Sequence, residues 1–189
     1  MYHSPCSKTL FDTPTEEEGN LLNDKDRRNF LSVLMTLMYL ARLTRPDILM
    51  PVTHLASRAH CATVRDVSHL KRVIWYLGNY PELGIVIHCL ELSIHCHCDA
   101  SFASHDLPAG GKGHTGYLVS MGEGLSYLHS RSGKQKVGSI SSTEAEIIAL
   151  VEAGKMCLWL RNVLTELGVV ELQQIRMYED NKSAITLVE

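Results

Sequence analysis

The sequence lacks several features that assign a protein to a broad class. With 18 Lys and Arg against 21 Asp and Glu, it has no basic excess of the kind that nucleic-acid-binding domains usually carry, so any such role must depend on local residues. Its most apolar run, residues 30–41, is shorter than the roughly 20 residues that a membrane-spanning helix needs, so no membrane segment is expected. The six cysteines form no regular framework and no signal peptide opens the chain, so we expect a reducing compartment without disulfides.

What is present is an ordinary globular composition. The 189 residues are 45% hydrophobic and 21% charged, which suits one large domain or two small ones. Residues 1–24 contain two prolines and an acidic trio but little apolar periodicity, which predicts an extended or disordered lead-in. Residues 25–84 show helical periodicity, and the pattern changes after residue 84.

Three helices are predicted in the segment 25–84. The first runs from about residue 26 to 41, and the second runs from 46 towards 58, with Pro51 predicting a kink or a late start. The third spans 63–78 and opens with a threonine and an aspartate at capping-pair spacing. Helical spacing assigns the following large side chains to the core: Met35, Met38, Tyr39, Trp75 and Tyr76.

The second half alternates like β-structure before it becomes helical. Strands are predicted at 85–88, 92–98, 117–121 and 125–130. The last three, with a glycine-rich loop at 109–116 and a turn at 122–124, predict a three-stranded antiparallel meander. A long helix then begins at Ser142 or Thr143 and ends at Gly168, with a break expected near Gly154. A short strand at 175–179 and a helix over 181–189 follow. The order β-β-β-α-β-α behind a helical segment predicts the α+β class with a mixed sheet.

Three carboxylates lie where these predicted elements start or stop. Asp99 ends a strand, Glu146 lies in the first turn of the long helix, and Asp180 follows the last strand. Phosphodiester hydrolysis by two magnesium ions needs oxygen ligands from several elements around ions about 3.5–4 Å apart, one activating water and the other stabilising the leaving oxygen. Carboxylates on neighbouring strands and a facing helix satisfy that requirement.

Each acid also has a purely structural interpretation. Glu146 follows Thr143 by three residues, which is the spacing of a capping box. Asp180 is placed to cap the terminal helix, and Asp99 to form an Asx-turn. Glu144 is the alternative to Glu146, although it is expected to point to a different side of the helix. Taken singly, each acid fits its structural interpretation at least as well as a catalytic one.

The chain resembles copia-type retrotransposon Pol over nearly its whole length. The motifs that carry the resemblance are "LMYLARLTRPDI" (37–48), "HLKRVIWYL" (69–77), "CDASF" (98–102), "GHTGYLVSMGEG" (113–124), "GKQKVGSISSTEAEIIAL" (133–150) and "EDNKSAI" (179–185). The resemblance implies an incomplete ribonuclease H-like fold over 85–189, behind a helical connection segment at 25–84 that follows a reverse transcriptase. It implies Asp99, Glu146 and Asp180 as catalytic acids and metal ligands. Because these three acids fall in the order and element context that the family site requires, we favour the joint site over their separate structural interpretations.

The implied activity is cleavage of the RNA strand of RNA–DNA hybrids with Mg²⁺, or Mn²⁺ in its place, in a two-ion site. The implied partners are the hybrid and an upstream reverse transcriptase domain, and the implied location is a cytoplasmic virus-like particle or the nucleus. Two departures matter: the family's fourth acid, in a further strand and helix, and its polymerase aspartates are not in this sequence, so no polymerase activity is expected. A catalytically inactive remnant, or a nucleic-acid-binding or structural module, remains the alternative.

Other polar residues are weaker candidates. The dense basic stretch with Arg131, Lys134 and Lys136 has the composition of a solvated turn, yet it precedes the helix bearing Glu146, where phosphate contacts would position a duplex. Three further polar side chains are candidates for contacts with RNA 2′-hydroxyls, namely Ser101, Asn181 and Ser183.

The run from His95 to Cys98 contains four residues that can bind zinc. Strand alternation sends neighbours to opposite faces and no spaced partner motif occurs, so we expect buried cysteines and two partly exposed histidines, His95 and His97, instead. His114 also has no assigned role.

Overall fold

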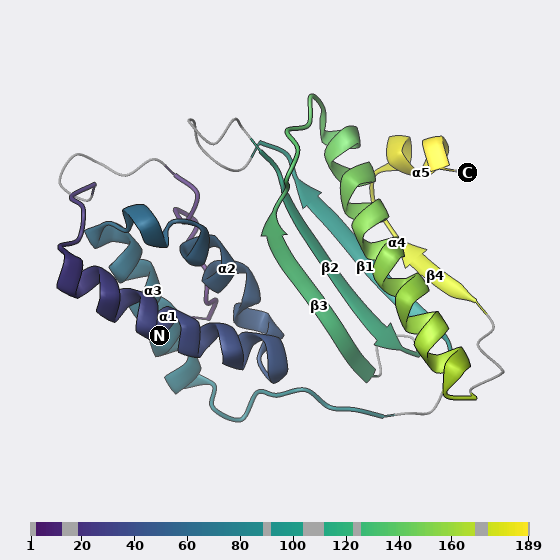
Figure 1. Cartoon of the computed structure of the whole chain (residues 1–189), viewed down its shortest axis with the longest axis horizontal. Coiled ribbons are helices and arrows are strands. Elements are labelled where there is room, and N and C mark those ends of the chain that lie inside the picture. Colours follow the sequence, from purple (N-terminus) through teal and green to yellow (C-terminus); the bar gives the residue numbers. More distant parts are fainter. Residues whose placement is uncertain are drawn as a thin grey trace. The chain divides into compact units, whose positions relative to one another are not determined.

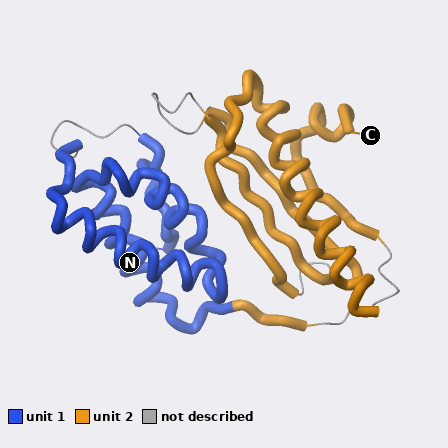
Figure 2. Tube along the Cα trace, in the orientation of Figure 1, with its two compact units in different colours: residues 1–84 blue, residues 85–189 orange. Residues whose placement is uncertain are grey.

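The structure is a computed structural model that describes residues 3–12, 19–88, 92–103, 112–122, 126–168 and 174–188. The chain divides into two compact units, residues 1–84 and 85–189 (Figure 2), and each is considered by itself. The described residues form five α-helices and a mixed four-stranded sheet, which confirms the α+β class. None of the described helices combines the length and apolarity that crossing a membrane requires.

The first unit is helical. Its elements are α1 (Asp24–Leu43), the 3-10 turn η1 (Pro46–Ile48), α2 (Leu49–Ser57), the 3-10 turn η2 (Ala59–Cys61) and α3 (Val64–Asn79). Pro51 lies in the first turn of α2, where no intrahelical hydrogen bond is lost, so the late start is confirmed rather than the kink. The capping box of Thr63 and Asp66 opens α3 as predicted.

Residues 3–12 contain no helix or strand and pack against these helices. Leu10 belongs to the buried core of the unit, and the Arg72 Nε donates a hydrogen bond to the Ser4 carbonyl at 3.1 Å. Burial of a leucine compensates for the ordering of a polar segment that lacks helical periodicity. The acidic trio at 16–18 and Pro14 lie outside the described residues.

The assignment of all five large side chains to this core is partly wrong. Tyr76 is buried, but Tyr39 is 72% exposed, Trp75 65% and Met35 44%. Each helix buries one stripe, and in α1 that stripe is formed by Phe30, Leu34, Leu37 and Ala41. Helical periodicity alone could not distinguish this stripe from the neighbouring apolar one, because both have the same spacing.

The second unit is built around the sheet (Figure 1). Its strands are β1 (Ile94–Ser101), β2 (His114–Met121), β3 (Ser126–Lys134) and β4 (Ile175–Tyr178), in the order β3-β2-β1-β4. The first three strands pair antiparallel as the predicted meander, and β4 pairs parallel to β1.

Several predicted strand limits are wrong. Among the described residues, the segment 85–88 takes part only in an isolated bridge between Ile87 and Ser126. β2 begins within the predicted glycine-rich loop, and β3 extends to Lys134, so Arg131 lies in a strand rather than in a turn. Gly122 adopts a φ of 70° after β2, which suits the predicted turn, whose residues 123–124 lie outside the described part.

Helix α4 (Ser142–Glu166) lies across one face of the sheet (Figure 1) and is continuous through Gly154, so the expected break is wrong. A Cβ at position 154 would lie 3.9 Å from the Met177 sulfur of β4, which shows that the glycine packs against the sheet. That packing compensates for the roughly 1 kcal/mol by which glycine disfavours a helix.

The start of α4 differs from the predicted capping box. Ser141 is the N-cap, and its hydroxyl accepts a hydrogen bond from the Glu144 backbone N–H at 3.1 Å. The Glu144 carboxylate in turn accepts from the Ile140 backbone N–H at 2.6 Å. Glu144 therefore has the capping role that the sequence spacing offered to Glu146. The Glu146 side chain takes no part in this cap.

Replacement of Ser141 by alanine is expected to lower the free energy of unfolding by about 1 kcal/mol, because the first turn of α4 loses its side-chain acceptor. Urea unfolding followed by circular dichroism measures the change. Thr143→Ala is the matched control, and a larger loss there than in Ser141→Ala would contradict the observed cap.

Candidate functional site

The end of β4 creates the place where the three acids meet. β4 pairs with β1 only from Ile94 opposite Ile175 to His97 opposite Tyr178. Asp99 therefore lies on β1 just beyond the end of its neighbour, and Asp180 follows β4 by two residues. The first turns of α4, which carry Glu146, pack at this end of the sheet.

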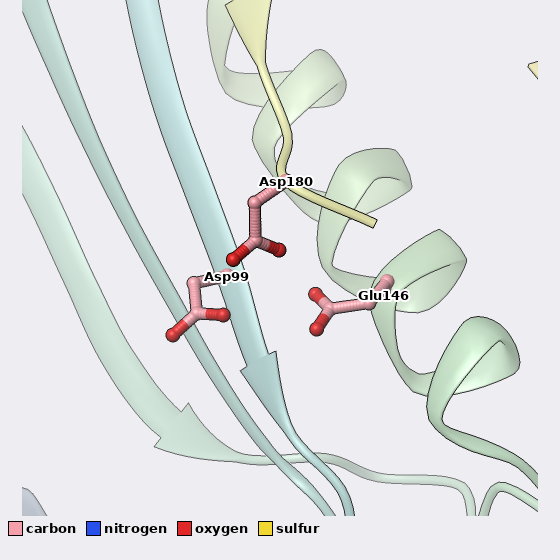
Figure 3. A group of neighbouring side chains, drawn as sticks. All are labelled: Asp99, Glu146 and Asp180. Atoms are coloured by element: carbon pink, nitrogen blue, oxygen red, sulfur yellow. The ribbon is translucent and has the colours of Figure 1, made fainter. Parts of the chain in front are cut away.

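The three predicted acids come together there (Figure 3). Each of Asp99, Glu146 and Asp180 offers one carboxylate oxygen, and these atoms all lie within 4.8 Å of one another. Glu146 is only 6% exposed, whereas Asp99 and Asp180 are exposed. The cluster thus has one buried carboxylate and two that face solvent, an arrangement open to a ligand from one side.

The pKa of Glu146 reflects its burial beside other carboxylates. Burial raises its pKa to about 7, and the negative charges of Glu179 and Asp99 add to the increase, while the backbone N–H of Ala100 opposes it. Within the described part of the chain, the Glu146 Oε2 is buried and has no hydrogen-bond partner. A buried oxygen of this kind needs a cation or a proton to compensate for lost hydration.

Glu179 is a neighbour that the sequence analysis missed. Its Oε1 accepts a hydrogen bond from the Asn181 backbone N–H at 3.0 Å, and its Oε2 contacts the Cys98 sulfur, the donor, at 3.6 Å. The signal was available in the strand alternation: Ile175 and Met177 face α4, and the next position of the same parity is 179.

The two other acids do not have the structural roles that the sequence offered them. The cap of α5 (Lys182–Val188) is Asn181, whose side chain accepts from the Ala184 N–H at 3.0 Å, so Asp180 does not have that role. Asp99 lies inside β1, which extends to Ser101, and not in a turn that leaves the strand.

The remaining candidate residues are distributed around this end of the sheet. Asn181 and the exposed Ser183 adjoin Asp180, and Ser101 ends β1 two residues after Asp99. Lys134 ends β3, and the Lys136 carbonyl accepts a hydrogen bond from the Lys112 ammonium at 2.7 Å. Arg131 forms an ion pair with Glu152 of α4 at 3.1 Å, which engages its guanidinium within the unit.

The histidines of β1 differ from expectation. His95 is fully buried rather than partly exposed, and its ring nitrogens form hydrogen bonds to the Ser93 hydroxyl and the Tyr178 hydroxyl, each at 2.9 Å. These two partners compensate for its burial. His97 is exposed and stacks on the Tyr178 ring with centroids 4.4 Å apart. The His114 Nε2 forms a hydrogen bond with the Ser132 hydroxyl at 2.6 Å.

Comparison with known proteins identifies relatives over most of the chain. The chain is 33% identical to the retrovirus-related Pol polyprotein from transposon RE1 of Arabidopsis thaliana, over 86% of the chain's length. It is 32% identical to the Pol polyprotein from transposon RE2 of the same plant, also over 86% of the chain. The identity to the Pol polyprotein from transposon TNT 1-94 of Nicotiana tabacum is 30%, over 98% of the chain. The matched region is 11%, 11% and 13% of those proteins, respectively.

No protein-family model matches the chain, and no solved structure matches it significantly. The similarity to the three polyproteins nevertheless extends through both units of the structure. The chain belongs to the family of retrovirus-related Pol polyproteins of copia-type transposons.

Proposed function

We propose that residues 85–189 carry a ribonuclease H-type site that cleaves the RNA strand of RNA–DNA hybrids in a Mg²⁺-dependent reaction. The observation that carries this proposal is the convergence of the Asp99, Glu146 and Asp180 carboxylates from a strand, a helix and a strand end. The proposed fold is correspondingly ribonuclease H-like, with an antiparallel meander, a parallel fourth strand and a covering helix.

The residues fit a hard divalent cation. All three ligands are carboxylate oxygens, which Mg²⁺ and Mn²⁺ prefer, and the buried Glu146 Oε2 has no other partner among the described residues. When bound, such ions supply activation of water and stabilisation of the leaving oxygen. The protein's own contribution is to fix three oxygens from different elements in one place before the substrate arrives.

The exposure of the acids indicates how the substrate approaches. Asp99 and Asp180 face solvent, so a phosphate of the hybrid is proposed to reach the site from their side, while the buried Glu146 would hold the cation from the opposite side. Ser101, Asn181 and Ser183 lie beside these acids in the chain and are proposed to contact ribose 2′-hydroxyls. Lys134 and Lys136 are proposed to contact phosphates, and Arg131 contributes less because Glu152 neutralises it.

A cleavage assay on a labelled RNA–DNA hybrid tests the proposal. The chain is expected to cleave RNA in Mg²⁺ and not in EDTA, and Asp99→Asn is expected to lower the rate by more than about 100-fold, since loss of even an outer-shell partner costs 10–100-fold. Asp24→Asn, at an exposed position in the helical unit, is the matched control. Equal rates in wild type and Asp99→Asn would refute the assignment, and absence of cleavage with intact metal binding would favour the inactive-module alternative.

The raised pKa of Glu146 gives a second prediction. The unfolded chain loses this proton near the ordinary value of 4.5 but the folded protein near 7, so in EDTA the associated stability is present below about pH 4.5 and is lost as the pH rises to 7. Glu146→Gln removes the ionisation and is expected to be more stable than wild type by about 1–3 kcal/mol at pH 8, with little difference at pH 4.5.

Urea unfolding at the two pH values measures this difference. Glu166→Gln, at an exposed position at the end of the same helix, is the matched control for the substitution itself. Addition of Mg²⁺ at pH 8 is expected to stabilise wild type and to have a smaller effect on Glu146→Gln. If the difference in unfolding free energy between wild type and Glu146→Gln does not change with pH, the Glu146 pKa is not raised.

A further inference from the structure

Gln135 is a buried polar residue that the proposed chemistry does not use. It follows the last residue of β3 and is only 2% exposed. Its backbone N–H donates a hydrogen bond to the Gly113 carbonyl at 2.8 Å, which fixes the chain at the point where β3 ends. A glutamine is rarely buried to this extent unless its amide is hydrogen-bonded.

The side-chain amide of Gln135 connects the sheet to α4. Its Nε2 donates to the Thr115 hydroxyl of β2 at 3.1 Å and to the Ala145 carbonyl of α4 at 2.9 Å. Thr115 is 1% exposed and Ala145 is fully buried, so this bridge is shielded from water. Ala145 immediately precedes Glu146 in the chain, and the bridge therefore acts on the turn that carries the buried carboxylate.

Gly113 brings the same amide close to the strand that carries Asp99. A Cβ at position 113 would lie 2.5 Å from the Gln135 Oε1 and 2.8 Å from the Ser101 carbonyl oxygen. Only a residue without a side chain leaves room for this approach. Ser101 is two residues from Asp99 on β1, so one planar amide lies between the segments that hold two of the three carboxylates.

We propose that Gln135 is a positioning residue that sets the separation between the Glu146 turn of α4 and the end of the sheet that carries Asp99. This inference rests on the proposed divalent-metal site. Its physical basis is that two hydrogen bonds from one rigid amide group, to a strand and to a helix, constrain both the distance and the orientation of those elements. Apolar packing at the same place would hold them together without fixing that geometry.

Gln135→Met tests this role, because methionine conserves the volume and removes both donors. Mn²⁺ binding to the full chain, measured by titration calorimetry, is expected to weaken by about 10-fold or more. Loss of a residue that orients a metal ligand typically has an effect of this size. Gln174→Met, the same change at an exposed position, is the matched control and is expected to leave Mn²⁺ affinity unchanged. Ile94→Val, in the core at the far end of β1, reports whether lower stability alone weakens binding.

Amide hydrogen exchange gives a readout that needs no metal. In Gln135→Met, exchange of the amides of residues 145–149 is expected to accelerate more than in Gln174→Met or Ile94→Val. Should Gln135→Met fail to fold, Thr115→Val removes one acceptor of the bridge and is expected to weaken Mn²⁺ binding by about threefold. The proposal is overturned if Mn²⁺ affinity is unchanged in the folded variant. If wild type itself binds no Mn²⁺, the proposed function fails, and the exchange rates alone decide whether Gln135 positions the helix.

Discussion

The close packing of α4 on the sheet is the constraint on which the candidate site depends. The fully buried residues of α4 are small, namely Ala145, Ala149, Ala153 and Cys157. Their four-residue spacing forms one narrow stripe, so the helix can approach β1 closely along its length. Glu146 lies beside this stripe, and its carboxylate reaches Asp99 only because the helix backbone is near the strand. Larger side chains in the stripe would move the helix outwards and separate the carboxylates.

This geometry opposes folding electrostatically, which supports the proposal that the three acids form a functional site. Like charges at close range and a buried carboxylate both oppose folding, and the pKa of Glu146 near 7 records that opposition. The structure offers only partial compensation within the described residues, because one oxygen of Glu146 has no partner. A divalent cation would remove the repulsion and satisfy this oxygen at once, which is the physical reason for favouring a metal site.

The sequence predicted the acids better than it predicted their surroundings. Asp99, Glu146 and Asp180 were found because junctions between elements can be located from periodicity even when strand limits are uncertain. The choice between capping and the site could not be made for Glu146, since a serine at 141 and a threonine at 143 offer equivalent spacings to Glu144 and Glu146. The burial of His95 was missed for a related reason: its partner Tyr178 lies 83 residues away, and local alternation contains no information about it.

Glu179 shows how a residue can influence the proposed metal site without belonging to the carboxylate cluster. Both carboxylate oxygens of Glu179 contact protein donors, one the Asn181 N–H and the other the Cys98 sulfur. Glu179 is not one of the three clustered acids. The negative charge of Glu179 nevertheless raises the pKa of Glu146 more than the negative charge of Asp99 does. The hydrogen bond to Asn181 also fixes the link between β4 and α5 that carries Asp180. Glu179 thus adds negative charge beside Glu146 and fixes the segment that carries Asp180.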